Sequence, residues 1–262
     1  MNLDLSNKNA LVAGSSQGIG FATAMKLANL GANVTLVARN EERLTKALNQ
    51  LPNNGQQTHN ILVADFNEPE LLQAKLERFL DSNTNFHILV NNSGGPPGGP
   101  IVKASLEEFH IAFQRHLACN HVLATALLDG MKAYGYGRII NVISTSVKQP
   151  LNGLGVSNTI RGAVASWAKT LANEVGQFGI TVNNVLPGAT KTVRLSSIIE
   201  NKASKLEKSI GDVENTMKSI IPAKRFAQPE EIANAIAFLA SPSASYINGI
   251  NLPVDGGRTA SL

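Results

Sequence analysis

The sequence contains one cysteine among 262 residues, and it has neither a long apolar run nor a cluster of basic residues. Cys119 alone cannot form an intrachain disulfide or a cysteine-based metal site, which is typical of a reducing compartment. The first residues lack the basic and apolar regions of a signal peptide, and no apolar run approaches the ~20 residues that span a bilayer. We therefore expect a cytoplasmic protein without a membrane partner.

Charge is nearly balanced, with 23 Lys and Arg against 19 Asp and Glu. The basic residues are scattered, so we expect no nucleic-acid partner. No spacing of His, Asp and Glu predicts a metal site. The length and the 43% hydrophobic content predict one domain over residues 1–262 with a sizeable core.

Apolar runs alternate with helical patterns along the chain. Strands are predicted at 10–13, 34–38, 61–64, 88–90, 139–143, 180–186 and 250–254, and helices at 19–30, 41–51, 69–81, 105–133, 153–177 and 229–240. This alternation predicts an α/β fold: a Rossmann-type doubly wound parallel sheet of about seven strands with helices on both faces. The polar segment 187–222 breaks the alternation. We expect it to be helical at most in short pieces and to cover the substrate.

The most specific motif is Ala13-Gly14-Ser15-Ser16-Gln17-Gly18-Ile19-Gly20. It follows the first predicted strand and opens a helix, an arrangement that directs backbone N–H groups and a helix N-terminus toward a pyrophosphate. Gly14 suits a turn with positive φ, and Gly18 and Gly20 allow the turn and the helix to pack closely. The motif therefore predicts a dinucleotide site.

Further motifs occur in order: Asp65, Asn91-Asn92-Ser93-Gly94, Ser144, Pro187-Gly188 and Val254-Asp255-Gly256-Gly257. With the glycine motif, they make almost the whole chain resemble the classical short-chain dehydrogenase/reductases, especially the 3-oxoacyl-(acyl carrier protein) reductase-like members. The resemblance implies hydride transfer between a nicotinamide cofactor and a carbonyl or alcohol. It also implies a small-molecule substrate and a homodimer or homotetramer.

The resemblance assigns the cofactor site to residues from several loops. They are Gly14, Ser16, Gln17, Gly18, Ile19, Gly20, Arg39, Asp65, Phe66, Asn92, Ser93, Gly94, Arg161, Pro187, Gly188, Thr190 and Thr192. Within this set, Asp65 would accept a hydrogen bond from the adenine, or serve as a turn or cap residue. Thr190 and Thr192 would donate to the carboxamide or the phosphates.

Cofactor choice depends on the end of the second predicted strand. Relatives that use NAD usually carry an acid where this chain has Ala38, and the next residue, Arg39, could pair with a 2′-phosphate. We therefore expect NADP(H) rather than NAD(H). Two observations oppose this: Arg39 could instead pair with Glu41 or Glu42, and Gln17 stands where many NADP-preferring relatives carry a basic residue.

The catalytic pattern of the family is altered here. Relatives use a Ser, a Tyr thirteen residues later, a Lys four residues beyond it, and an Asn on an earlier helix. Ser144 fills the first position, but Ser157, Arg161 and His116 stand at the other three.

These changes alter the acid–base chemistry. Ser144 can bind a carbonyl oxygen, and Arg161 can bind ribose hydroxyls, but an alkyl hydroxyl such as Ser157 is a poor acid. The unperturbed imidazole pKa of about 6.5 leads to the hypothesis that His116 delivers the proton, directly or through Ser157 or water. The alternative is a packing or surface histidine. Lys148 would border the substrate, or be a solvated loop lysine.

Three functions remain open at this point. The first is an NADP(H)-dependent oxidoreductase that reduces a 3-oxoacyl group or a related ketone with an atypical proton relay. The second is a catalytically silent NAD(P)-binding sensor or scaffold, and the third is a non-redox lyase or epimerase that uses the same pocket. The intact cofactor motifs favour the first two, and Ser144 favours the first.

Overall fold

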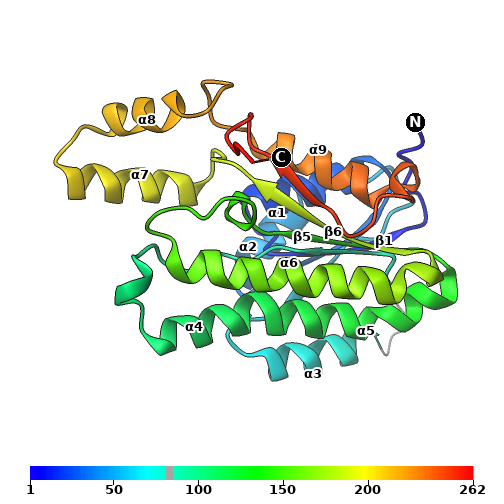
Figure 1. Cartoon of the computed structure of the whole chain (residues 1–262). Helices are drawn as coiled ribbons and strands as arrows, with labels where there is room; N and C mark the ends of the chain where they lie inside the picture. Colours follow the sequence, from blue (N-terminus) through cyan, green and yellow to red (C-terminus); the bar gives the residue numbers. More distant parts are fainter. Residues whose placement is uncertain (81–84, 262) are drawn as a thin grey trace.

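The central element of the fold is a parallel sheet. In the computed structural model, which describes residues 1–80 and 85–261, seven strands lie in the order β3-β2-β1-β4-β5-β6-β7 (Figure 1). The strands are β1 (Asn9–Ala13), β2 (Asn33–Ala38), β3 (Asn60–Val63), β4 (Ile88–Asn91), β5 (Gly137–Val142), β6 (Ile180–Pro187) and β7 (Asn251–Val254). The predicted fold class and strand positions are confirmed.

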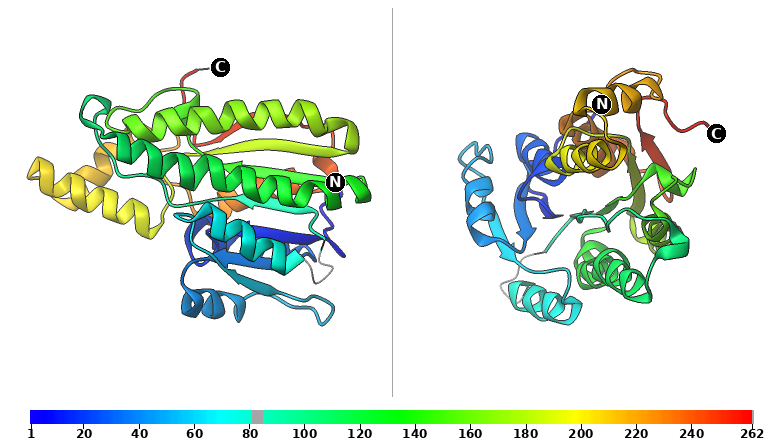
Figure 2. Two further views of the ribbon diagram at one scale, coloured as in Figure 1. Left: turned by 90° about the horizontal axis from the view of Figure 1, so that it is seen from below. Right: turned by 90° about the vertical axis from the view of Figure 1, so that its left-hand side faces the viewer.

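Helices cover both faces of the sheet, as two perpendicular views show (Figure 2). They are α1 (Gly18–Asn29), α2 (Glu41–Leu48), α3 (Pro69–Leu80), α4 (Leu106–Phe113), α5 (Cys119–Tyr134), α6 (Gly155–Val175), α7 (Val193–Leu206), α8 (Ile210–Ser219) and α9 (Pro229–Ala240). Helices α1, α2 and α9 pack in one apolar cluster with the strands, and α3, α5 and α6 pack in another. The inner strands β1, β2, β4, β5 and β6 are largely buried, which explains their continuous apolar runs, whereas the outer strands β3 and β7 are mostly partly exposed.

Strand order reverses between β1 and β4, which are hydrogen-bonded neighbours. In open parallel sheets, ligands bind outside the carboxyl ends of the strands at such a switch point. The glycine motif follows β1, and the Asn92-Ser93-Gly94 segment follows β4. The topology therefore brings two distant motifs to one crevice.

A row of asparagines crosses the sheet from β4 to β7. Asn91 Nδ2 donates to Asn141 Oδ1 at 2.9 Å, and Asn141 Nδ2 donates to Asn184 Oδ1 at 2.9 Å. Asn184 Nδ2 then donates to Asn251 Oδ1 at 2.8 Å. Each donor–acceptor pair is also a register pair of the sheet. Three hydrogen bonds thus link the four amides in a polar row that the strands align, and the Asn91 Oδ1 at its start has no partner among the described residues.

The helical pattern at 105–133 is divided in the structure. A π-helical segment, Gln114–Ala118, separates α4 from α5. A π segment places one more residue in a helical turn and often occurs at functional sites. The periodicity predicted the helix but not this local widening, which lies at His116.

The prediction for 187–222 was wrong in its secondary structure, since α7 and α8 together form a helical pair beyond the edge of the sheet (Figure 1). Thr192 and Ser209 cap the two helices by accepting hydrogen bonds from the Leu195 and Asp212 N–H groups. Leu195 and its neighbours at four-residue spacing, Ile199 and Ala203, form a buried stripe. The capping residues and the apolar spacing do indicate two helices, but the polar composition of the segment favoured a loop.

Candidate active site

The glycine turn is packed too closely for side chains. Gly14 has φ +59°, and a Cβ on it would lie 2.5 Å from the Asn92 carbonyl oxygen. A Cβ on Gly20 would lie 2.2 Å from the Gly14 carbonyl oxygen. Asn92 Nδ2 holds the turn by donating to the Ala13 and Gly14 carbonyls at 3.3 and 3.2 Å. The requirement for glycine at these positions is therefore steric.

The turn fits the phosphates of a dinucleotide. The N-cap residue of α1, Gln17, makes no side-chain hydrogen bond to the first helical N–H groups. Those N–H groups stay available to an anion at the positive end of the helix dipole. The predicted site residues of this segment lie in the turn and at the start of the helix: Ser16, Gln17, Gly18 and Ile19.

Arg39 and Asp65 lie side by side at the carboxyl ends of β2 and β3. Arg39 Nη1 is 4.0 Å from Asp65 Oδ2, and the Arg39 side chain is 72% exposed. Neither Glu41 nor Glu42 pairs with Arg39 in the described residues, and Glu42 instead pairs with Lys46 at 2.6 Å. The exposed guanidinium is free to turn toward a phosphate near this edge.

Asp65 also has a local structural role. Its Oδ1 accepts from the Asn67 backbone N–H and Nδ2, at 3.0 and 2.8 Å. Phe66 follows in the same turn and packs partly against the core. The turn role predicted as an alternative for Asp65 is therefore present, and it leaves Oδ2 for other partners.

Ser144 and Arg161 are both held at the end of β5. Ser144 follows the strand, and its Oγ accepts from the Ser146 N–H at 3.1 Å. Arg161, on α6, is 7% exposed and donates from Nη1 to the Val142 carbonyl at 3.1 Å. Burial and then Arg194 lower the pKa of Arg161 to about 10, so it is a cation at neutral pH. Ser157 lies one helical turn before Arg161 on the same helix.

His116 is enclosed in the site and is not a surface histidine. It is 1% exposed, and its Nδ1 lies 2.6 Å from the Ser93 hydroxyl, while Nε2 has no hydrogen-bond partner among the described residues. Burial, followed by the charges of Arg161, Arg115 and Arg194, lowers the pKa of His116 to about 2. The unperturbed pKa considered from the sequence does not hold for His116 here, because the sequence alone could not show this burial or these charges.

The segment after β6 is held by local hydrogen bonds. Thr190 Oγ1 donates to the Gly188 carbonyl at 3.0 Å, and Thr192 Oγ1 donates to the Thr190 carbonyl at 3.3 Å while capping α7. Gly188 N–H, next to Pro187, donates to the Val254 carbonyl at 2.9 Å, which ties the segment to β7. Both hydroxyls already have local acceptors.

One further residue of the site, Arg194, was not predicted from the sequence. Arg194, in the first turn of α7, donates from Nη1 to the Gly95 carbonyl at 2.8 Å and from Nη2 to the Pro96 carbonyl at 3.0 Å. These bonds join α7 to the loop after β4, beside the exposed Gly94. Lys148 directly follows the short 3₁₀ helix Thr145–Val147. No sequence motif singled out Arg194, since only the fold brings these segments together.

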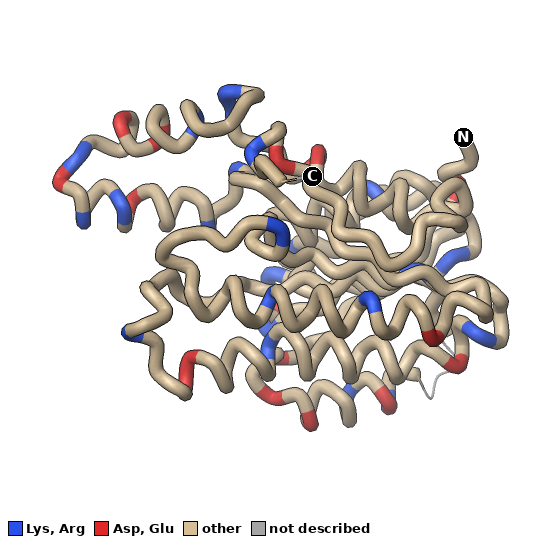
Figure 3. The backbone as a smooth tube through the Cα atoms, viewed as in Figure 1, with Lys and Arg blue, Asp and Glu red and all other residues tan. Residues whose placement is uncertain are grey.

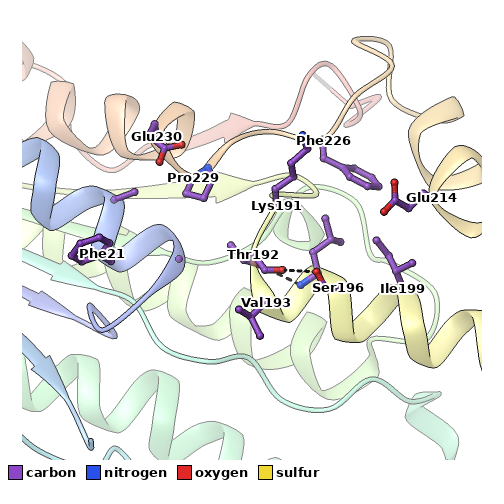
Figure 4. A pocket seen from close by; sticks show the side chains of 13 residues that line it. Phe21, Lys191, Thr192, Val193, Ser196, Ile199, Glu214, Phe226, Pro229 and Glu230 are labelled. Atoms are coloured by element: carbon purple, nitrogen blue, oxygen red, sulfur yellow. Dashed lines mark hydrogen bonds between the residues drawn. The ribbon is translucent and has the colours of Figure 1, made fainter. Parts of the chain in front are cut away.

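A cavity of about 540 Å³ lies outside the glycine turn, between α1, α7 and α9 (Figure 4). Its lining includes Gly18, Phe21, Thr192 and Phe226, and none of the four predicted catalytic residues. The cavity therefore borders the predicted cofactor site without being the catalytic pocket.

The residues at 1–80 and 85–261 hold no group of three or more His, Cys, Asp and Glu placed to bind a metal ion. No helix in the same ranges is long and apolar enough to cross a membrane. In the view of Figure 3, acidic and basic positions are spread over many elements.

Comparison with known proteins agrees with this geometry. Residues 13–259 match the family described as enoyl-(acyl carrier protein) reductase. The 3-oxoacyl-[acyl-carrier-protein] reductase FabG of Vibrio cholerae is 34% identical over 258 residues, covering 97% of this chain and 98% of that protein. The L-sorbose reductase of Gluconobacter frateurii, solved with NADPH and L-sorbose, has a TM-score of 0.93 at 33% identity, with both chains fully covered. YwfH, an NADPH-dependent reductase involved in bacilysin biosynthesis, has a TM-score of 0.92 at 27% identity, covering 98% of this chain and 100% of that one.

The fold, the glycine turn and these matches define a nicotinamide-dependent oxidoreductase. The chain belongs to the short-chain dehydrogenase/reductase family. It is thus an NAD(P)-dependent oxidoreductase that acts on carbonyl or alcohol groups.

Proposed function

We propose that this protein is an NADPH-dependent reductase of a ketone, a 3-oxoacyl compound or a related one, that works without the tyrosine of its relatives. The observation that carries the proposal is the placement of Arg161. Its guanidinium donates to the Val142 carbonyl, two residues before Ser144. The cation is therefore anchored to the same strand end that carries a hydroxyl able to bind a carbonyl oxygen.

The bound nicotinamide would supply the hydride. The chain contributes orientation and charge: Ser144 Oγ donates to the substrate oxygen, and Arg161 offers positive charge to the developing alkoxide and hydrogen bonds to ribose hydroxyls. The preference for NADPH is supported by exposed Arg39 and by the absence of an acid at Ala38. L-sorbose reductase, solved with NADPH, is a consistent relative.

A neutral His116 changes the proton relay proposed from the sequence. With its pKa lowered to about 2, the imidazole holds one proton at neutral pH. We assign that proton to Nε2, so that Nδ1 accepts from the Ser93 hydroxyl across 2.6 Å. In the proposed relay, His116 passes the proton from Nε2 to the substrate oxygen, through Ser157 or water, as Nδ1 takes the proton of the Ser93 hydroxyl. The Ser93 oxygen then regains a proton from water.

The test is NADPH oxidation with a panel of ketones, β-ketoacyl thioesters and sugars. Activity that falls about 10²–10³-fold in Ser144→Ala, with NADPH affinity unchanged, supports the proposal. NADPH binding without oxidation of any carbonyl would instead identify a silent binding protein. Activity unaffected by His116→Ala would remove the histidine from the relay while leaving the reductase in place.

The proposal has three further parts: the protein forms a dimer or tetramer, it is cytoplasmic, and segment 187–222 covers the substrate. They are supported by the family resemblance and by the contact of Arg194 with the loop after β4. Sedimentation velocity measures the first directly.

A further inference from the structure

Two arginines converge on one point of the active site. A Cβ on Gly95 would lie 2.9 Å from Arg194 Nη2 and 3.5 Å from Arg161 Nη2. One arginine comes from the start of α7 and the other from α6, so the fold brings them together over the loop after β4. A side chain at Gly95 would make the Arg194 guanidinium shift.

Neither arginine has an acidic partner in the described chain. The ion pairs there join Arg39, Lys46, Lys132, Lys218 and Arg225 to carboxylates, but not Arg161 or Arg194. Arg194 also lowers the pKa of buried Arg161, as expected for two like charges held close together. An anion between them would remove that repulsion.

The two guanidiniums have hydrogen-bond donors to spare. Each carries five N–H groups in a planar fork. Arg161 directs Nη1 to the Val142 carbonyl, and Arg194 directs one N–H each from Nη1 and Nη2 to the Gly95 and Pro96 carbonyls. These bonds fix both planes and leave other N–H groups for a ligand. A planar carboxylate matches this fork geometry best.

The pair also lies beside the proposed reaction centre. Arg161 is anchored two residues from Ser144, and the charges of both arginines act on His116. An anion at this place would therefore be attached close to the carbonyl that Ser144 binds.

We propose that Arg161 and Arg194 bind the carboxylate of the substrate, so that the enzyme reduces a short oxo acid to the hydroxy acid. The inference rests on the proposed reductase function. The carbonyl carbon gains the hydride from NADPH, the carbonyl oxygen gains a proton, and hydroxy acid and NADP⁺ are released. Reactions that form oxo acids, such as transamination or decarboxylative condensation, would supply such substrates.

The diphosphate of the cofactor is an alternative anion that the two arginines could bind. The glycine turn and the uncapped start of α1 already provide for phosphates. If Arg194 instead served the diphosphate, its loss would weaken NADPH binding equally with every substrate. The two sources are therefore separable by kinetics.

The first experiment compares matched acids and esters: 2-oxobutanoate with its methyl ester, and acetoacetate with its ethyl ester. For wild type we expect the acids to be preferred in kcat/KM. In Arg194→Gln, which keeps a donor for the Gly95 carbonyl but removes the charge, we expect the KM for the acid to rise about 10- to 100-fold. The KM for NADPH and the ester kinetics should change little, and Arg194→Lys should recover part of the loss.

The matched control is Arg43→Gln, which changes an exposed arginine on α2. It should leave all these values unchanged. Equal reduction of acid and ester by wild type would overturn the inference and leave the reductase intact. A selective rise of the KM for NADPH in Arg194→Gln would assign the arginines to the cofactor.

The second experiment does not require turnover. Malonate and its neutral analogue malonamide are titrated calorimetrically into the protein with saturating NADP⁺. We expect malonate to bind and malonamide not to bind. Malonate affinity should fall at least tenfold in Arg194→Gln and in Gly95→Ala, and added salt should also weaken it. Absence of malonate binding to wild type would overturn the anion site. Binding by a protein that reduces no carbonyl would retain the anion site and reject the reductase.

Discussion

His116 Nδ1 lies 2.6 Å from the hydroxyl of Ser93, which joins the π segment between α4 and α5 to the loop after β4. The partner of each imidazole nitrogen decides which one carries the proton. With Nδ1 facing a hydroxyl and Nε2 without a partner, the ring is placed as a neutral relay. The short contact also positions the loop that carries Gly95.

Acid should destabilise the protein through His116. Its pKa falls from 6.5 to about 2 on folding, so the unfolded chain binds a proton that the folded chain rejects once pH drops below 6.5. This contribution reduces the free energy of unfolding by about 2 kcal/mol at pH 5 relative to pH 7.5. His87, whose pKa burial lowers to about 4, acts in the same direction.

Urea unfolding at pH 7.5 and 5 measures the effect. His116→Asn should reduce the loss of stability between these pH values, and His87→Gln should reduce it further. An unchanged pH dependence in both single variants would contradict the assignment of neutral, buried imidazoles.

Ser144→Ala should lower kcat by about 10²–10³-fold, because it removes a donor to the developing oxyanion. The matched control is Ser146→Ala, a serine two residues away whose buried hydroxyl has no hydrogen-bond partner among the described residues. Losing that hydroxyl should leave kcat nearly unchanged. Fluorescence titration should give the same NADPH affinity for both variants. Equal activities in the two variants would contradict the role of Ser144.

Arg39→Ala should weaken NADPH binding about 10- to 100-fold, because a charge-assisted hydrogen bond to the 2′-phosphate is lost. NADH, which lacks this phosphate, should bind with nearly unchanged affinity. Dissociation constants for both cofactors test the prediction, with Arg43→Ala as the surface control. A parallel loss for NADH would show that Arg39 acts through Asp65 rather than through the phosphate.

Gly20→Ala should abolish tight cofactor binding and lower stability by roughly 1–3 kcal/mol, since its Cβ would overlap the Gly14 carbonyl. Gly211→Ala, at an exposed position of α8 with free space around it, should stabilise by a few tenths to about 1 kcal/mol. Thermal unfolding with and without NADPH measures both effects. A cofactor-dependent rise in Tm that persists in Gly20→Ala would contradict the steric argument.

Much of the fold was predictable because buried parallel strands have continuous apolar runs and glycine turns have a strict spacing. The sequence also predicted Ser144, Ser157, Arg161 and His116 as one group, since their offsets from strands and helices follow from the family pattern. Those predictions depend on local order along the chain.

Other features depend on contacts between distant segments, which no local pattern reports. The pKa of His116 reflects burial and three arginines from three elements. Arg194 is a residue of the site only because the fold places the start of α7 against Gly95, a contact that the sequence does not report. In contrast, the helices at 193–206 and 210–219 did carry capping and spacing signals, and the overall polarity of that segment outweighed them.

The asparagine row through Asn91, Asn141, Asn184 and Asn251 has a consequence for how the chain folds. Because side chains alternate between faces, a slip of one residue at any of these strands would move its asparagine away from its partners and leave buried amides without hydrogen bonds. The unpaired amides raise the free energy of slipped arrangements of β4 to β7, in addition to the cost of lost packing. The row therefore fixes the register of β4 to β7, and with it the positions at which the segments carrying Ser93, Ser144 and Gly188 leave the sheet.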